Sequence, residues 1–325
     1  MALADSAKRS NRTPERAIKG EAIMADLLQI GGITDAMRDR LTPEFTIHQE
    51  PGPQITQVIT NGHDGVPLDV MAACPNLKMI SCYGVGYDAI DTSEAVKRGI
   101  MVTHTPDVLN AEVATTAIML LMACYRELLR DEAWVRSGNW AAKGNAPLTR
   151  SLDNQIIGIL GMGRIGQEIA RKLEPWNPLI IYHTRTPKDV PYEHVPDLVD
   201  MARRCDALIV ITPGGAATRH LVNAEVLEAL GPDGTLVNVA RGTVVDEAAA
   251  IAALQSGRLG WAGLDVFEDE PQVPEALRAL RNVVLLPHVG SATVETRAAM
   301  GNLSVDNLLK FKEEGTVLTP VPECR

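Results

Sequence analysis

Residues 156–166 read IIGILGMGRIG, so a short apolar run leads directly into the spacing G-x-G-x-x-G. The apolar run has the length and composition of a buried strand, and residues 167–173 continue as a helix. Gly161 permits a tight turn, Gly163 lets the backbone approach a pyrophosphate, and Gly166 lets helix and strand pack closely. The stretch predicts a strand, a phosphate-binding turn and a helix.

The start of this helix adds to the phosphate site. The N–H groups at its first turn, around Arg164 and Ile165, have no partner within the helix and carry a partial positive charge. A glycine turn with a purely structural role is the alternative. The strand before it and the helix after it favour a dinucleotide site instead.

The next strand predicts which dinucleotide binds. Sites selective for NAD usually end this strand with an acidic residue that binds the ribose hydroxyls. Here the strand ends at His183 and is followed by Thr184, Arg185 and Thr186. A guanidinium between two hydroxyls suits a 2′-phosphate, so we expect NADP(H), with NAD as a weaker substitute. The alternative is a solvated polar turn.

Working outward, apolar runs recur through the second half of the chain. We expect strands at residues 156–160, 179–183, 207–211, 235–239, 261–265 and 283–286, with helices between them. This alternation predicts a doubly wound parallel sheet.

The first half shows a similar alternation, with expected strands at residues 26–30, 46–48, 57–59, 79–82 and 101–103. Asn110 is expected to cap a buried helix that runs to about Arg130 and crosses between the two halves. A final helix is expected from after Ser291 to about Glu314, and the short tail at 316–325 can return to the first half.

These elements predict an α/β fold with two Rossmann-like or flavodoxin-like domains, parallel sheets and a cleft between them. The expected divisions are a flexible tail at residues 1–24, a substrate-binding domain at 25–108 plus 293–325, and an NADP-binding Rossmann domain at 109–292. The length of 325 residues also favours two domains.

Composition excludes several function classes. The formal net charge of −10 gives no basic field for a phosphate backbone, so we expect no nucleic-acid partner. Five scattered cysteines lack metal-ligand spacing and indicate reduced thiols, no metal and a cytoplasmic location. The longest apolar stretch, 113–125, is shorter than the roughly 20 residues that a membrane helix needs.

Three polar segments follow expected strands of the second half: VNVARG at 237–242, DVFEDEP at 265–271 and LPHVGSAT at 286–293. The carboxyl ends of parallel strands face one crevice, so these segments should converge there. Singly, Arg241 or Glu270 could be surface ion-pair residues and His288 an ordinary loop histidine. As an ordered set beside a dinucleotide fold they predict a catalytic site.

With these motifs the chain resembles the D-isomer-specific 2-hydroxyacid dehydrogenases over residues 26–322. The sequence PGG at 213–215 followed by TRH at 218–220, and the turn at 184–186, resemble the glyoxylate/hydroxypyruvate reductase branch. The resemblance implies NADPH-dependent reduction of a small 2-oxo acid to the D-2-hydroxy acid.

Hydride transfer to a ketone builds negative charge on its oxygen, which requires a proton donor. Histidine suits that role near neutral pH, so His288 is the expected acid. Glu270 would orient the imidazole, as carboxylates do in hydrolase triads. Arg241 would bind the substrate carboxylate and polarise the carbonyl through its planar donor fork.

Further site residues are implied by the resemblance. The glycine-containing loop at 83–88 would hold the substrate acid through Val85 and Gly86, where a plain turn is the alternative. The other implied cofactor contacts are Thr212, Pro213, Thr218, Ala240, Asp265 and Gly290, together with Arg241 and His288. Thr115 departs from the family, in which many members carry an acidic residue.

Several functional alternatives remain at this point. A dinucleotide-sensing corepressor would keep the same residues. A related dehydrogenase could act on a longer 2-oxo acid such as 2-ketogluconate. Formate dehydrogenases are disfavoured because they pair the histidine with glutamine, and phosphoglycerate dehydrogenases with a regulatory tail because only 37 residues follow His288.

Substrate choice depends on contacts made by the loops around 52–53 and 141–148, and the sequence contains no pattern that predicts the conformation of these loops. The family associates as two-fold dimers, and Trp134 and Trp140 lie in the segment that relatives use for this. We therefore expect a homodimer, with core or surface packing as the alternative role for both tryptophans.

Overall fold

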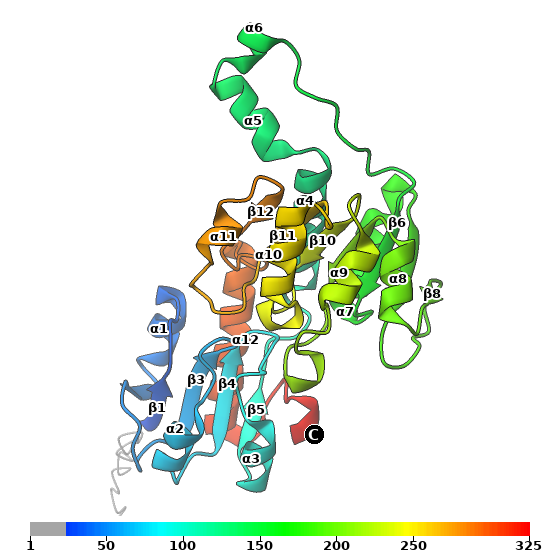
Figure 1. Ribbon diagram of the computed structural model, residues 1–325. Helices are drawn as coiled ribbons and strands as arrows, with labels where there is room; N and C mark the ends of the chain where they lie inside the picture. Colours follow the sequence, from blue (N-terminus) through cyan, green and yellow to red (C-terminus); the bar gives the residue numbers. More distant parts are fainter. Residues whose placement is uncertain (1–23) are drawn as a thin grey trace, which may run out of the picture.

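The computed structural model describes residues 24–325. The expected flexible tail, residues 1–24, falls almost wholly on residues 1–23, which lie outside the described part. Two parallel β-sheets, each covered by helices, lie one above the other in Figure 1. The predicted α/β class with two Rossmann-like units is confirmed. Within residues 24–325 no helix is long and apolar enough to cross a membrane.

The first sheet has five parallel strands in the order β2-β1-β3-β4-β5. This order is the flavodoxin-like arrangement, in which strand order reverses beside β1. The strands are β1 Ala25–Gln29, β2 Phe45–His48, β3 Gln57–Asn61, β4 Met79–Tyr83 and β5 Met101–Thr103. Its helices are α1 Asp35–Leu41, α2 Leu68–Ala73, α3 Thr92–Lys97 and α12 Val294–Glu314.

The second sheet has seven parallel strands in the order β12-β11-β10-β9-β6-β7-β8, with its reversal between β6 and β9. The strands are β6 Ile156–Leu160, β7 Leu179–His183, β8 Glu193–His194, β9 Ala207–Val210, β10 Thr235–Asn238, β11 Trp261–Leu264 and β12 Val283–Leu285. Its helices are α4 Asn110–Tyr125, α7 Arg164–Leu173, α8 Leu198–Arg204, α9 Ala224–Leu230, α10 Glu247–Ser256 and α11 Glu275–Arg278.

The long crossover helix predicted from 111 to about 130 is wrong in two respects. Leu109, not Asn110, is the N-cap, and Asn110 is the first helical residue. The helix ends at Tyr125 because Glu127 adopts a left-handed conformation, with φ 42°. A second helix, α5 Leu128–Arg136, begins there and has no buried residue, unlike α4.

Residues 141–148 are expected to lie in a loop, but a short helix, α6 Asn139–Lys143, reaches into this stretch. Together α5 and α6 form an arm that stands away from both sheets at the top of Figure 1. The seventh strand of the second sheet, β8, was also not predicted. It has only two residues, too few for a periodic pattern.

The chain ends return to the first sheet. Helix α12 contacts β4 and α1, and the Val321 N–H donates to the carbonyl of Val102 at 2.9 Å. Helix α4 instead contacts α7, β10 and β11 of the second sheet. The expected domain boundaries at 109 and 292 fit these contacts and stay a prediction. Both sheets direct their carboxyl-terminal loops into the space between them.

Candidate active site

A cavity of about 190 Å³ lies between the carboxyl ends of the two sheets. The loops after β3 and β4 form one wall with Gly62, His63, Asp88 and Ala89. The loops after β10 and β11, with His288 after β12, form the other wall with Arg241, Gly242, Thr243, Phe267, Glu268, Glu270 and His288. The structure therefore brings all three predicted catalytic side chains to one cavity.

His288 and Glu270 form a short pair, with Nδ1 and Oε2 2.7 Å apart. An ionised carboxylate only accepts hydrogen bonds, so Nδ1 carries a proton and Nε2 is left for a reacting group. His288 adopts a left-handed backbone conformation, with φ 52°. Such a conformation is costly for a residue with a Cβ and is often found at functional sites.

The surroundings of Glu270 keep it ionised. Burial raises its pKa, but the hydrogen bonds from His288 and from the Phe267 N–H, and the charges of His288 and His63, outweigh burial and lower the pKa. The Phe267 N–H donates to Oε1 at 3.0 Å. Both carboxylate oxygens are therefore held, which fixes the orientation of the imidazole.

Asp265 secures the backbone of the histidine loop. Its two carboxylate oxygens accept the N–H groups of Val289 at 2.7 Å and Gly290 at 2.8 Å. Its carbonyl accepts the N–H of His288 at 2.8 Å. Burial raises the pKa of Asp265, and the two backbone hydrogen bonds oppose that rise. The resemblance implied that Asp265 contacts the cofactor, and the structure shows in addition that it holds the loop of His288.

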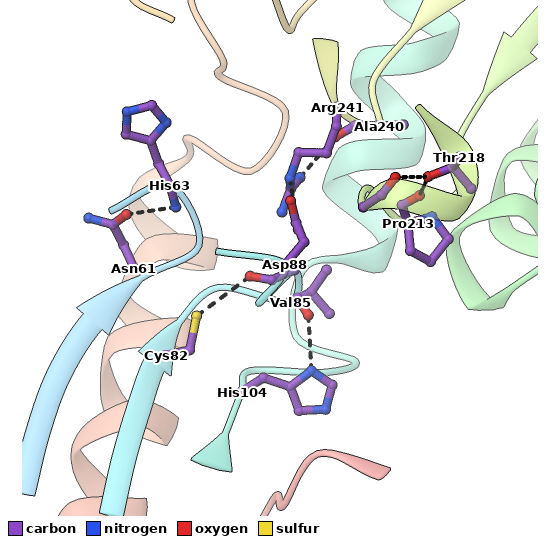
Figure 2. A network of polar contacts seen from close by, with 12 residues as sticks. Asn61, His63, Cys82, Val85, Asp88, His104, Pro213, Thr218, Ala240 and Arg241 are labelled. Atoms are coloured by element: carbon purple, nitrogen blue, oxygen red, sulfur yellow. Dashed lines mark hydrogen bonds and ion pairs between the residues drawn. The ribbon is translucent and has the colours of Figure 1, made fainter. Parts of the chain in front are cut away.

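Arg241 bridges the two walls. Its Nε lies 3.2 Å from Oδ1 of Asp88, and its Nη1 donates to the carbonyl of Ala240 at 2.8 Å. A Cβ on Gly86 would lie 1.7 Å from Nη2 of Arg241, so this guanidinium nitrogen touches the loop after β4. Figure 2 shows Arg241 and Asp88 directed toward each other across the cleft.

The loop after β4 offers two unused donors at this point. Within residues 24–325 the N–H groups of Val85 and Gly86 make no hydrogen bond. The Val85 carbonyl is turned away and lies 3.0 Å from Nδ1 of His104. The two free N–H groups belong to the loop that Nη2 of Arg241 touches, and neighbouring backbone N–H groups suit a carboxylate.

The glycine turn fits the pyrophosphate of a dinucleotide. A Cβ on Gly161 would lie 2.7 Å from the Ile211 carbonyl and one on Gly166 2.1 Å from the Gly161 carbonyl, so both positions require glycine. A Cβ on Gly163 would meet open space, where a ligand can approach. Arg164 is the first residue of α7, and its Nε lies 3.0 Å from Oδ1 of Asp107. Ile165 follows it in the first turn of the helix.

The turn after β7 is folded on itself. Oγ1 of Thr184 donates to the carbonyl of Thr186 at 2.7 Å, and Nε2 of His194 lies 2.9 Å from the Thr184 carbonyl. Arg185 is exposed and forms no ion pair within the described residues. The guanidinium is therefore available to an anionic ligand.

The other carried-over positions lie on the second sheet. Thr218 Oγ1 donates to the carbonyl of Pro213 at 2.8 Å, which closes the loop that begins at Thr212 (Figure 2). Ala240 precedes Arg241 and is buried. Thr115 lies on the exposed side of α4, where its hydroxyl accepts from Lys172 at 2.6 Å. It does not line the cavity.

Two polar side chains on the first wall of the cavity, Asp88 and His63, were not assigned a role from the sequence. Asp88 closes the quoted loop 83–88, and His63 follows the end of β3. The rule that located Arg241 also applies to them, because both follow the carboxyl ends of parallel strands. Within residues 24–325 no cluster of histidine, cysteine and acidic side chains could hold a metal ion.

Comparison with protein families matches residues 118–290 to the D-isomer specific 2-hydroxyacid dehydrogenase, NAD binding domain. The 2-ketogluconate reductase of Gluconobacter oxydans is 43% identical over 307 residues, covering 91% of this chain and 98% of the reductase. The Arabidopsis thaliana glyoxylate/hydroxypyruvate reductase A is 47% identical over 268 residues, covering 82% of this chain and 85% of the reductase.

Among solved structures, similarity extends to a Sinorhizobium meliloti NADPH-dependent glyoxylate/hydroxypyruvate reductase in complex with NADP and malonate. The TM-score is 0.88 at 47% identity, covering 92% of this chain and 97% of that one. A 2-hydroxyacid dehydrogenase from Ketogulonicigenium vulgare has a TM-score of 0.86 at 43% identity. The match covers 91% of this chain and 98% of that one.

Proposed function

We propose that this chain, which belongs to the D-isomer specific 2-hydroxyacid dehydrogenase family, reduces a small 2-oxo acid to the D-2-hydroxy acid with NADPH. The glyoxylate/hydroxypyruvate type of substrate is the one named for two of its relatives. One observation of this chain carries the proposal. Arg241, whose Nη2 touches the loop of Val85 and Gly86, lines the same cavity as a histidine held by a glutamate.

The carboxylate of the substrate would bind first to the donor set. The N–H groups of Val85 and Gly86 and the Nη2 group of Arg241 supply the hydrogen bonds, and the guanidinium supplies the charge. Asp88 holds Nε of Arg241, so the fork is oriented before substrate arrives. The oxygen of the reacting carbonyl is then directed toward His288.

His288 would donate a proton to that oxygen. The hydride adds to the carbonyl carbon, its π bond breaks, and the electron pair left on oxygen takes the proton from Nε2. Glu270 stabilises the imidazole while the proton is present and fixes the tautomer when it has left. The positive charge of Arg241 reduces the cost of the negative charge that builds on oxygen.

NADPH, when bound, supplies the hydride. The turn at Gly161, Gly163 and Gly166 would hold its pyrophosphate, and the free guanidinium of Arg185 would pair with the 2′-phosphate. Thr212, Pro213, Thr218, Ala240, Asp265 and Gly290 would complete the site as the family resemblance implies, with NAD as a weaker substitute.

The first experiment is a panel of 2-oxo acids assayed with NADPH and NADH. Glyoxylate, hydroxypyruvate and 2-ketogluconate should separate the two substrate types named for the relatives. Turnover of at least one with NADPH is expected. Absence of turnover with every acid and both cofactors contradicts the proposal. A dinucleotide-sensing corepressor, the other function considered, receives no support from the relatives.

Cofactor selectivity has its own test. In Arg185→Ala the ratio of kcat/KM with NADPH to that with NADH should fall about tenfold or more, because a charge-assisted hydrogen bond is worth roughly 1.5–3 kcal/mol. The NADH value itself should stay within about twofold. An unchanged ratio excludes a phosphate role for Arg185.

A homodimer is the assembly that we propose. The arm of α5 and α6 and the chain after it expose Leu129, Val135, Trp140 and Leu148, with Leu148 98% exposed. Apolar surface of this kind favours association. Leu129→Asp combined with Trp140→Asp should shift the mass in light scattering to that of a monomer. Leu179→Asp, an equally exposed leucine on β7, is the matched control.

The cytoplasm is the location that we propose. All five cysteines are free, which fits a reducing compartment.

A further inference from the structure

His63 lines the cavity but takes no part in the proton transfer described above, beyond the effect of its charge on the pKa of Glu270. It follows Gly62 in the loop after β3, on the wall opposite His288. A Cβ on Gly62 would lie 2.4 Å from the Gly86 carbonyl and 3.5 Å from Nη2 of Arg241. The backbone that carries His63 is therefore packed against the proposed carboxylate site.

The loop around His63 is held rigidly. Oδ1 of Asn61 accepts the N–H groups of His63 at 2.9 Å and Asp64 at 2.8 Å, and its Nδ2 donates to Asp64 at 2.6 Å. Figure 2 shows the imidazole of His63 standing beyond the end of β3, away from Asn61. In the part of the chain that the structure describes, the imidazole makes no hydrogen bond. The backbone of His63 is thus held in place, and its unpaired imidazole is available to a ligand.

The three substituents of the reacting carbon indicate which part of the substrate lies near His63. The carboxylate binds the donor set at Arg241, and the carbonyl oxygen accepts the proton from His288. The remaining substituent must lie along the rest of the cavity, between Ala89 and His63 on one wall and Phe267 on the other. His63 is the polar side chain on the first wall that is not already paired.

The charges around the cavity favour a neutral polar substituent there. Glu268 already pairs with Arg219 at 2.7 Å and His220 at 2.8 Å, and Asp88 pairs with Arg241. The basic partners of these acids, like the His288 partner of Glu270, are already paired, so His63 is the basic side chain of the cavity left to balance a second substrate carboxylate. A hydroxyl group, which donates and accepts, matches an imidazole without this negative charge.

We propose that His63 is a specificity-determining residue that hydrogen-bonds a hydroxyl group on the carbon next to the reacting carbonyl, so that the chain prefers 3-hydroxy-2-oxo acids over alkyl or unsubstituted 2-oxo acids. This inference rests on the proposed function. It adds a contact to the substrate wall and leaves the proton donor unchanged.

The test compares hydroxypyruvate, pyruvate and glyoxylate as probes with NADPH, in wild type, His63→Leu and His63→Gln. Hydroxypyruvate carries the hydroxyl, pyruvate carries a methyl group in its place, and glyoxylate has no substituent. Leucine keeps a similar volume without hydrogen bonding, whereas glutamine keeps a donor and an acceptor.

Wild type should use hydroxypyruvate at least about tenfold more efficiently than pyruvate, the discrimination expected of one hydrogen bond. His63→Leu should lower kcat/KM for hydroxypyruvate about tenfold, mainly through KM, with pyruvate and glyoxylate within about twofold. His63→Gln should recover a good part of the loss. Calorimetry with the NADPH-loaded protein, which cannot oxidise a hydroxy acid, should show weakened binding of D-glycerate and unchanged binding of D-lactate in His63→Leu.

An equal loss on all three acids in His63→Leu indicates a structural role and overturns the proposal, as does no loss on hydroxypyruvate. Neither result affects the proposed function, because glyoxylate turnover by wild type tests that separately. A wild type that reduces none of the three acids nor 2-ketogluconate overturns both.

Discussion

The two walls of the cleft are built differently. The wall from the seven-stranded sheet supplies three side chains, Arg241, Glu270 and His288. Glu270 hydrogen-bonds His288, and the buried Asp265 holds the backbone that follows it. The wall from the five-stranded sheet supplies free backbone N–H groups at Val85 and Gly86, with few side chains. We infer that Glu270 and His288 of the first wall carry out the proton transfer, whereas the second wall, together with Arg241, recognises the substrate. Changes at Glu270 or His288 should lower kcat, and changes in the second wall should raise KM.

The largest effect is expected from His288→Ala. Loss of a general acid typically costs about 10²–10⁴ in rate, so kcat should fall about a thousandfold. NADPH binding, measured by fluorescence titration, should stay within about twofold, because the phosphate contacts lie elsewhere. Normal turnover in this variant would remove His288 from the mechanism and with it the contrast between the walls.

Glu270→Gln should lower kcat about a hundredfold, an effect within the range of losing correct histidine orientation. The carboxylate has a second, pH-dependent effect. Because its pKa is lowered below 4.5 in the folded chain, ionisation contributes stability above about pH 4.5, and this is lost as pH falls through the folded pKa.

Melting temperatures of wild type and Glu270→Gln, measured from about pH 7 down to about pH 4, check this sign. The advantage of wild type should be constant near neutral pH and shrink in acid. An advantage that grows as pH falls would show that burial, which raises the pKa, dominates instead.

Gly86→Ala tests the recognition wall. The new methyl group would lie 1.7 Å from Nη2 of Arg241, and the flexible guanidinium must move to admit it. Misplacing a substrate-positioning group by about 1 Å costs up to about a hundredfold, so kcat/KM should fall about 30-fold, chiefly through KM. The melting temperature should change little. A loss confined to kcat would contradict the division between the walls.

The sequence predicted the first wall far better than the second. Buried strands such as β6 and β7 are continuous apolar runs, and residues that follow them in recognisable motifs converge by topology. On the second wall the donors at Val85 and Gly86 are backbone groups, which any residue carries. Only the resemblance singled them out.

Side chains that act through long-range contacts were also missed. Asp88 meets Arg241 across 153 positions of sequence, and no periodic pattern marks such a partner. The break between α4 and α5 depends on the backbone conformation of Glu127, which propensity does not specify. Both are tertiary effects, decided by how the two sheets meet.

The smallest effect expected is that of Asp88→Asn, and it probes where the walls meet. Asparagine keeps an acceptor for Nε of Arg241 but removes the charge, so the fork stays near its position with less electrostatic restraint. The pair is only partly exposed, at 25% and 29%, and a substrate carboxylate competes with Asp88 for the same guanidinium. The two consequences oppose each other, because weaker orientation raises KM while removal of a competing anion lowers it.

Orientation should dominate, since Asp88 contacts Nε whereas Nη2 faces the donor set at Gly86. KM for glyoxylate should therefore rise about fivefold with kcat within about twofold, as expected for one partly exposed charge-assisted contact. Asp88→Ala, which removes the acceptor as well, should raise KM further. A fall in KM in Asp88→Asn would show that the acid restrains access of the substrate and that the two walls compete for Arg241.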